Sequence, residues 1–528
     1  MTNVDHSKTT VYLVGSGIAS LASAVYLIKD AHIPGKNIHI LEQDKVPGGA
    51  LDGSGNTSQG YLTRGGRMHE KHYVCTWDFL SNIPTLEDPN ITVKEQTFAF
   101  NEKFVSDAHA RLLKAGRIMD VSSFGLSLKD KARMLELLLH THEESLGNQR
   151  IEDWFTPDFF ETIYWMLWNS MFAFQKWSSV VEMRRYSIRF IQLLPGLQKL
   201  GGILRTAYNQ YDAVVRPSRK WLEARGVQFD MNRQVVDIDF DFDDGKKTAT
   251  KIRLKDGEEI ELTATDYVFI TNGSIVDCSN TGSMTKAPIL KTKEESGSWM
   301  LWERIAKKHA DFGNPGVFSD NIALQKWMSF TVTLKDPTFF RWMQDFSGNL
   351  AGTGGLVTLT DSSWGMSIVM ERQPYFIDQP EDVQIFWGDG LYPDRIGDFV
   401  TKKMSDCNGK EILQELFSHL KIMDKMTPTW ESEDTQCLPV MMPFIDSEFM
   451  PRNLGDRPKV IPDGSTNFAF LGQFTEIADD CVFTVEYSVR SAQTAVYSLF
   501  NTGKEPLPVY QGMHDPLVVI RAVEAINR

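Results

Sequence analysis

Residues 10–31 read "TVYLVGSGIASLASAVYLIKDA", and this stretch decides the fold. Apolar Val11–Val14 predicts a buried strand, Gly15–Gly17 a tight turn, and the small residues that follow a helix packed closely on the strand. Gly17 would let a pyrophosphate approach the backbone at the positive end of that helix. Ser20 stands where the usual pattern has its third glycine, and it is small enough to keep the close packing.

A second strand, "NIHILEQ" at residues 37–43, is predicted to follow the helix and to end near Glu42. An acid at the end of that strand, about 20 residues beyond the glycines, can accept hydrogen bonds from a ribose. A G-x-G-x-x-G pattern alone is weak, because it occurs in unrelated loops. Strand, glycines, helix, strand and acid in this order predict dinucleotide binding.

Two later stretches repeat the strand-and-glycine pattern. "DYVFITNGS" (266–274) predicts a buried strand that ends at Asn272-Gly273, and the stretch 467–496 predicts a strand ending at Gly472 and a helix from about Phe483. A helix that begins beside a glycine there would aim its N-terminus at a flavin ring or its ribityl chain. The sequence therefore predicts an α/β fold whose FAD-binding Rossmann-type domain is assembled from separated stretches.

Composition limits the partners and the compartment. The 528 residues carry a net charge of −14, from 55 basic and 69 acidic residues, which disfavours nucleic acid as a partner. No leader and no apolar run of the ~18 residues that a membrane crossing needs are visible. The five cysteines are dispersed without a C-x-x-C pair, so we expect reduced thiols in a cytoplasm and no metal site.

The insertions between the Rossmann stretches are expected to hold the substrate. Residues 159–177, "FFETIYWMLWNSMFAFQKW", would be apolar on every face of a helix, which is typical of a buried helix or of one that lines an apolar channel. The predicted domains are an FAD-binding Rossmann-type domain (9–124, 216–280 and 461–500), a helical substrate-channel insertion (125–215), a mixed α/β substrate domain (281–460) and a C-terminal helical tail (501–528).

Several long motifs resemble one family, the oleate hydratases, once called myosin-cross-reactive antigens. They include "GYLTRGGR" (60–67), "EMRRY" (182–186), "RTAYNQYD" (205–212) and "MMPFIDSEFMPR" (441–452), and the resemblance runs from about Val11 to Pro516. It implies addition of water to a cis double bond of free unsaturated fatty acids, as in oleate to a 10-hydroxy product. It also implies bound FAD without net redox change. We expect a monomer or weak homodimer and leave transient peripheral membrane contact open.

The resemblance implies a water-activating glutamate in the loop "RGGRMHEKHY" (64–73), but this chain has Met68 at that position. A thioether cannot take a proton from water. Glu70 and His69 are the nearby candidates for the role. The alternative for Glu70 is a surface glutamate paired with Lys71, and for Met68 a packing residue.

Tyr186 matches the family's proton donor, and Gln210 matches its substrate-contacting glutamine. A phenol with a pKa near 10 is a weak acid, so it would have to act through its position. The alternative for Tyr186 is a core tyrosine whose hydroxyl is satisfied. Isolated alkenes are not polarised, so hydration needs such a placed acid, a placed water and a dry apolar site.

A second departure concerns the carboxylate of the fatty acid. Where the family offers threonine, asparagine and histidine, this chain has Val369, Glu371 and Tyr375. Arg372 could bind the carboxylate instead, as a bidentate partner. The predicted cofactor-binding residues are Gly15, Ser16, Gly17, Ala19, Glu42, Gly49, Arg64, Gly65, Gly66, Asn272, Gly273, Gly472 and Phe483.

Two other functions stay open on sequence grounds. A redox flavoenzyme of the desaturase or amine oxidase type could use the same fold, although it would need NAD(P) or oxygen as electron partner. No second complete glycine-rich fingerprint lies between the FAD stretches. A flavin-binding protein with altered activity is the other alternative, because two functional positions have changed.

Overall fold

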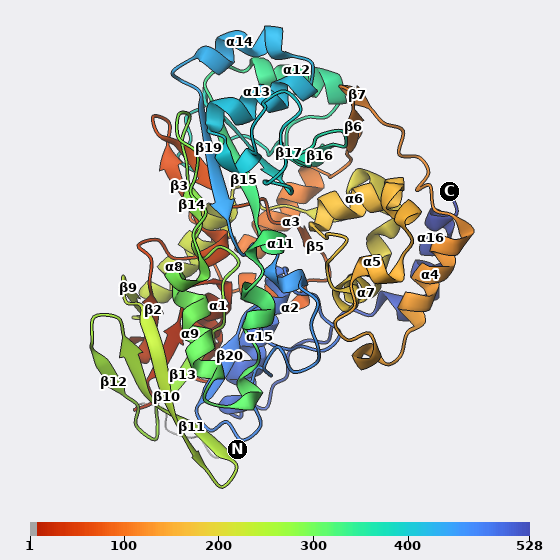
Figure 1. Cartoon of the computed structure of the whole chain (residues 1–528). Helices are drawn as coiled ribbons and strands as arrows, with labels where there is room; N and C mark the ends of the chain where they lie inside the picture. The colour runs from red at the N-terminus through yellow and green to blue at the C-terminus, as the bar shows by residue number, and fades with distance from the viewer. Residues whose placement is uncertain (1–7) are drawn as a thin grey trace.

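The glycine-rich stretch begins a five-stranded parallel sheet in the computed structural model, which describes residues 8–528 (Figure 1). The strand order is β20-β13-β1-β2-β9. Val11 lies opposite Ile38 on one side and Tyr267 on the other. The strands are β1 (Val11–Val14), β2 (Ile38–Glu42), β9 (Gln228–Met231), β13 (Tyr267–Thr271) and β20 (Phe468–Leu471). The predicted Rossmann-type sheet from separated stretches is confirmed.

Two long helices pack against each other beside this sheet, α1 (Ile18–Lys29) and α15 (Val485–Leu499). Ser20 is fully buried on α1, as its small size allows. α15 starts two residues later than Phe483, because the Thr484 side chain caps it by accepting a hydrogen bond from the Tyr487 N–H. α8 (Arg216–Glu223) leads into β9, and the antiparallel sheet β10 (Val235–Asp243), β11 (Lys246–Leu254) and β12 (Glu259–Glu261) follows it.

A second sheet of eight strands forms the upper part of the molecule in Figure 1. Its third strand, β15 (Trp327–Leu334), is buried at every residue between β19 and β18, and β4 (Gly60–Thr63) contacts it. The other strands are, in sheet order, β14 (Asn280–Thr281), β19 (Gln436–Met442), β18 (Gln384–Gly390), β17 (Met366–Val369), β16 (Leu356–Leu359), β6 (Leu112–Lys114) and β7 (Arg117–Ile118).

The predicted division into domains stays a prediction, but the assignment of residues 112–118 to the Rossmann-type domain does not agree with the sheet pairing. β6 and β7 lie within residues 9–124, yet β6 pairs in parallel with β16 at the edge of the eight-stranded sheet. The hairpin β3 (Gly53–Asn56) and β4 (Gly60–Thr63) and the helices α12 (Thr338–Ser347), α13 (Gly409–His419) and α14 (Met423–Glu431) surround this sheet, and α11 (Ile322–Gln325) leads into β15. Of the other helices of residues 281–460, α9 (Gly297–Ala306) packs on β10, and α10 (Gly316–Ser319) contacts the 3-10 segment Ser447–Phe449.

The helical insertion stands to one side of both sheets in Figure 1. It contains α4 (Leu128–Leu139), α5 (Ile151–Trp154), α6 (Ile163–Phe172) and α7 (Val180–Arg189), and the C-terminal α16 (Pro516–Ile526) packs against the 3-10 segment Ile191–Lys199. Between it and the parallel sheet lie α2 (Val74–Leu80), α3 (Val93–Lys103) and the pair β5 (His69–Glu70) and β8 (Ile203–Leu204).

The single aromatic helix predicted over residues 159–177 is wrong. A 3-10 segment, Pro157–Glu161, comes first, and α6 starts only after Thr162, whose side chain accepts a hydrogen bond from the Trp165 N–H. α6 ends at Ala173, which adopts a left-handed conformation with φ +61°. Within residues 8–528 no helix has both the length and the apolar character that crossing a membrane requires.

Candidate functional site

A cavity of about 420 Å³ opens where β1, β2 and β13 end, and we call it the glycine cavity. Gly15 has φ +88°, which only glycine adopts without strain, and it makes the turn into α1. A Cβ on Gly17 would meet no protein atom within 4 Å, so the missing side chain leaves space for a ligand and not for the fold. The N-cap residue of α1 is Gly17, which makes no side-chain capping hydrogen bond, so an anion can approach the N-terminus of this helix.

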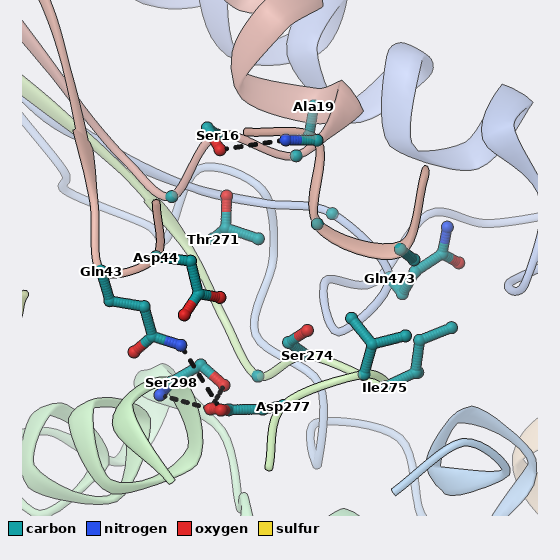
Figure 2. A pocket seen from close by; sticks show the side chains of 18 of the residues that line it. Ser16, Ala19, Gln43, Asp44, Thr271, Ser274, Ile275, Asp277, Ser298 and Gln473 are labelled. Carbon is teal, nitrogen blue, oxygen red and sulfur yellow. Dashed lines mark hydrogen bonds between the residues drawn. The ribbon is translucent and has the colours of Figure 1, made fainter. Parts of the chain in front are cut away.

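The end of β2 supplies a buried acid to this cavity. The Ser16 N–H and hydroxyl donate to the Glu42 Oε2 at 2.8 and 2.5 Å, and the Asp44 N–H donates to Oε1. Burial raises the pKa of Glu42 in spite of these hydrogen bonds. Figure 2 shows Gln43 pointing from the same strand end toward Asp277. The cavity therefore has a polar end beyond β2, suited to a ribose and a base.

The opposite wall comes from the loops after β13 and β20. Asn272 is buried there, and neither its amide oxygen nor its amide nitrogen has a hydrogen-bond partner. Arg67 lies over the ring of Phe483 at 5.6 Å. All predicted cofactor residues except Gly65 and Gly66 line the cavity, and Arg67 was missed by the prediction although it is next to them in sequence.

The loop with Gly65 and Gly66 faces the eight-stranded sheet. A Cβ on Gly66 would stand 3.0 Å from the Glu371 carboxylate, so no larger residue fits without a shift. The Gln210 amide, oriented to satisfy its neighbours, donates to the Gly65 carbonyl at 3.3 Å and accepts from the Arg67 N–H at 2.9 Å. Gln210 therefore holds this loop in place.

Met68 is half-buried and packs against an apolar cluster that includes Trp327 and Trp387. Its neighbour His69 is buried without a hydrogen-bond partner on either ring nitrogen. Burial and the adjacent Arg67 charge lower the pKa of His69 to about 4, so the imidazole is neutral near pH 7. Met68 does not line the glycine cavity, and its packing alternative agrees with these contacts.

The surface alternative for Glu70 is wrong. Glu70 is 1% exposed, and its Oε1 accepts from Arg189 Nη1 at 2.8 Å. Its Oε2 accepts from the His72 N–H at 2.9 Å and lies 3.0 Å from the His72 ring. Burial opposes ionisation, but these hydrogen bonds and the Arg189 charge outweigh it and lower the pKa of Glu70. Both oxygens are engaged, and Glu70 does not line the glycine cavity.

A second cavity of about 250 Å³, the apolar cavity, lies inside the helical insertion and is lined almost entirely by hydrophobic side chains. α4, α6, α7, the 3-10 segment Ile191–Lys199 and α16 build its walls. Lys131 and Asn527 are polar residues among those lining it, and the Lys131 ammonium donates to the Asn527 side chain at 2.9 Å. A chain of methylene groups with a charged end would suit such a space.

Tyr186 lines neither cavity, but its ring packs against residues that line the apolar cavity and, through Phe449, it is linked to the glycine cavity. Its ring packs at 5.1 Å from Phe172 and 5.4 Å from Phe190, which line the apolar cavity. On the other side Phe449 lies 5.7 Å from Tyr186 and 5.4 Å from Phe483, which lines the glycine cavity. The Tyr186 hydroxyl donates to the Val482 carbonyl at 2.6 Å.

The hydroxyl of Tyr186 is therefore satisfied, as expected for a core tyrosine. Burial raises the pKa of Tyr186 well above its usual value, and nearby acidic groups, including Glu448, raise it further. A phenol with a raised pKa is a weak acid. It would transfer its proton only in the transition state, to a carbon atom held directly beside it.

An ion-pair network anchors α7. Glu182 is fully buried and accepts from Arg452 Nε and Arg457 Nη1, both at 2.9 Å. Burial opposes the charge on Glu182, but the two guanidinium groups outweigh it and lower its pKa to about 2. Arg185 pairs with Glu476 and with Glu143, both at 2.7 Å.

The predicted head-group residues lie next to Gly66. Val369 is buried in the apolar cluster, and Glu371 pairs with Arg205 Nη1 at 2.6 Å. The Tyr375 hydroxyl and the Arg205 Nε and Nη2 are buried without partners. The prediction that Arg372 binds the carboxylate is not supported, because Arg372 is exposed and stacks on Phe104 at 5.0 Å. Arg205 is the buried guanidinium here, and the prediction did not single it out although it opens the motif "RTAYNQYD".

Within residues 8–528, one side-chain cluster outside these cavities has the composition of a metal site: Asp398, Glu415 and His419 offer ligand atoms within 4.8 Å of one another. The His419 ring lies 3.1 Å from Asp398, and Glu415 accepts backbone N–H groups of residues 398–400. These contacts account for the cluster as a cap of the loop before α13.

Comparison with known proteins places these features in context. Residues 8–497 match the MCRA family. The chain is 40% identical over 534 residues to an oleate hydratase of Streptococcus pyogenes serotype M49 (strain NZ131), covering 98% of this chain and 90% of the relative. It is 31% identical to a linoleate hydratase of Lactiplantibacillus plantarum, covering 98% of each chain.

Solved structures share the fold at low sequence identity. Cyclohexylamine oxidase from Brevibacterium oxydans IH-35A superposes with a TM-score of 0.53 at 11% identity, covering 93% of this chain and 98% of that chain. A putrescine oxidase variant redesigned in its cofactor binding gives 0.51 at 12% identity, covering 93% and 99%. These likenesses concern the fold alone.

Proposed function

The chain belongs to the MCRA family and is a hydro-lyase of the hydratase type, and we propose that it adds water to a cis double bond of a free unsaturated fatty acid with FAD bound. The observation that carries the proposal is the pair of cavities. One is built around the Rossmann glycines and the other is apolar, and the Tyr186 ring packs on Phe172 of the apolar cavity and on Phe449, which lies toward the glycine cavity. An alkene hydratase needs an acid beside a dry acyl site.

The residues of the glycine cavity fit FAD. Gly17 leaves space at the N-terminus of α1 for a pyrophosphate, and Glu42 Oε1 has a lone pair left for a ribose hydroxyl. The unpartnered amide of Asn272 offers a donor and an acceptor to a ligand. When bound, the flavin would supply redox chemistry that hydration does not consume, so its role in the proposed reaction is to shape and polarise the site.

Tyr186 is the proposed acid, and the apolar cavity is the proposed acyl site. Aromatic side chains would exclude water from the alkene, which strengthens the electrostatic effect of any polar group beside it. Lys131 at the polar side of the cavity would attract the fatty acid carboxylate. The predicted water-activating role of Glu70 stays a prediction, and its complete pairing with Arg189 and His72 does not favour it.

The remaining parts of the proposal concern the setting. We place the reaction in the cytoplasm, and the five buried free thiols agree with that location. The monomer or weak homodimer and the transient membrane contact stay predictions. The preferred double-bond position and chain length of the fatty acid should depend on the depth of the apolar cavity, and the product assay below measures both.

The test is incubation of the FAD-loaded protein with oleic, linoleic and palmitoleic acids, followed by analysis of the products. The proposal expects hydroxy acids, with the flavin spectrum unchanged on adding substrate. A redox enzyme of the amine oxidase or desaturase type would bleach the flavin and form no hydroxy acid. That result would replace the hydratase with the redox alternative that the shared fold also allows.

A further inference from the structure

Glu448 is a buried carboxyl group that has no role in the reaction as proposed so far. It lies in the 3-10 segment Ser447–Phe449, on the loop that follows β19, and it lines the glycine cavity. It is 0% exposed, yet neither carboxylate oxygen has a hydrogen-bond partner. Burying an unpartnered carboxylate is costly, so such a group in a cavity is a candidate for function.

The other acids that line the glycine cavity are engaged or exposed. Glu42 accepts from Ser16, Asp52 pairs with Arg64, and Asp277 accepts from Ser298; Asp44 and Glu295 are exposed. Among the residues that the structure describes around this cavity, Glu448 alone is a buried carboxyl without a partner.

The backbone carbonyl of Glu448 accepts a hydrogen bond, whereas its carboxylate has no hydrogen-bond partner. Arg457 Nη2 donates to the Glu448 carbonyl at 2.6 Å, and Arg457 Nη1 holds Glu182 of α7. The next residue, Phe449, packs on both Tyr186 and Phe483. Glu448 is therefore anchored next to Phe449, which contacts the proposed acid, and it is one of the residues that line the glycine cavity.

We propose that Glu448 is the general base that activates the attacking water, an inference that rests on the hydratase function proposed above. The alkene π electrons take the Tyr186 proton and form the new C–H bond. A lone pair of the water oxygen forms the C–O bond on the other carbon, and the proton that this oxygen loses passes to the Glu448 carboxylate. The proton then returns from Glu448 to the Tyr186 phenolate through exchange with solvent, so the alcohol is the only net product.

The electrostatics of the pocket suit this role. Burial raises the pKa of Glu448 to about 8, and the positive charges of Arg457 and Arg67 offset part of the effect. A base whose pKa lies near the working pH is effective in proton transfer. The ionisable groups that face it or influence its charge from the neighbouring elements are Arg67 beyond β4, Glu182 and Tyr186 on α7, Asp446 on its own loop, and Arg457.

The test compares three variants of the FAD-loaded protein. Glu448→Gln keeps the size of the side chain and removes the base, so kcat should fall by about 100-fold or more while flavin occupancy is kept. Glu448→Asp should retain a measurable part of the activity. Asp446→Asn is the matched control, because Asp446 is also a buried carboxyl with an unpartnered oxygen but does not line the glycine cavity. It should keep kcat within about threefold of the parent.

A readout independent of turnover is the pH titration of the carboxyl band in infrared difference spectra. The parent should show a protonated carboxyl that ionises near pH 8, and this band should be missing from Glu448→Gln and kept in Asp446→Asn. The activity of the parent should rise with pH over the same range.

The outcomes separate this inference from the proposed function. A parent that hydrates no acid overturns both. An active parent with an equally active Glu448→Gln variant overturns only the role of Glu448. A loss of activity in Asp446→Asn as large as in Glu448→Gln would show general disruption of the loop and would also overturn it.

Discussion

Gly17→Val should abolish flavin binding and leave the folded apoprotein almost unchanged. Gly17 has φ −66° and ψ 174°, which valine adopts readily, and a Cβ there meets no protein atom within 4 Å. The apoprotein should therefore lose less than about 1 kcal/mol of unfolding free energy. The branched side chain would instead occupy the space in front of α1. Losing two charge-assisted hydrogen bonds of about 1.5–3 kcal/mol each weakens flavin binding by at least about 100-fold.

The matched control is Gly15→Ala, two residues earlier. Its Cβ also has room, 3.6 Å from the Thr271 side chain, but φ +88° imposes a backbone strain of about 1–3 kcal/mol. Gly15→Ala should therefore lower the unfolding midpoint of the apoprotein, and Gly17→Val should not. Calorimetric titration with FAD and chemical denaturation of the apoproteins measure the two effects. Stoichiometric flavin in purified Gly17→Val would refute the assignment of this cavity.

Three further changes address the acid, the buried ion pair and the acyl site. Tyr186→Phe should lower kcat at least about tenfold with KM and flavin affinity kept, and loss of the hydrogen bond to Val482 should cost about 1 kcal/mol of stability; parent-like kcat would move the acid elsewhere. Glu70→Gln leaves Arg189 with a neutral partner and should lower the unfolding free energy by about 2–4 kcal/mol in denaturant titrations. Because the pKa of Glu70 is depressed in the fold, its stabilisation is present above the unfolded pKa and is lost as the pH falls through the folded one, so variant and parent should converge in acid. Leu194→Trp should fill the apolar cavity and raise KM for long-chain acids about tenfold or more without affecting flavin binding; an unchanged KM would place the acyl chain elsewhere.

The cofactor cradle could be predicted from sequence because its key features are local. The turn at Gly15, the space at Gly17 and the acid at the end of β2 follow from short-range geometry that one βαβ unit imposes. The parallel sheet was predicted on the single assumption that the strands ending in glycines pair side by side, and this prediction is confirmed. The prediction of one aromatic helix failed because hydrophobicity does not show where a helix restarts, whereas the Thr162 cap does.

The polar groups of the site could not be predicted, because their partners come from distant parts of the chain. Glu70 was expected on the surface or at the water, and only the tertiary fold brings Arg189 to it. The pairing of β6 with β16, which crosses the predicted domain boundary, has the same origin. Glu448 belongs to the motif "MMPFIDSEFMPR", which was recognised as part of the family resemblance. Nothing in the motif itself indicates which of its residues lines the glycine cavity.

The most direct test of the hydratase function is the origin of the product's oxygen and hydrogen. The FAD-loaded protein is incubated with oleic acid in oxygen-18-labelled water and, separately, in deuterium oxide, while the flavin spectrum and dissolved oxygen are recorded. We expect a hydroxy acid with one solvent oxygen on one former alkene carbon and one solvent hydrogen on the other, with the flavin oxidised throughout and no oxygen consumed. Flavin bleaching, oxygen consumption or a product whose hydroxyl does not come from water would contradict it.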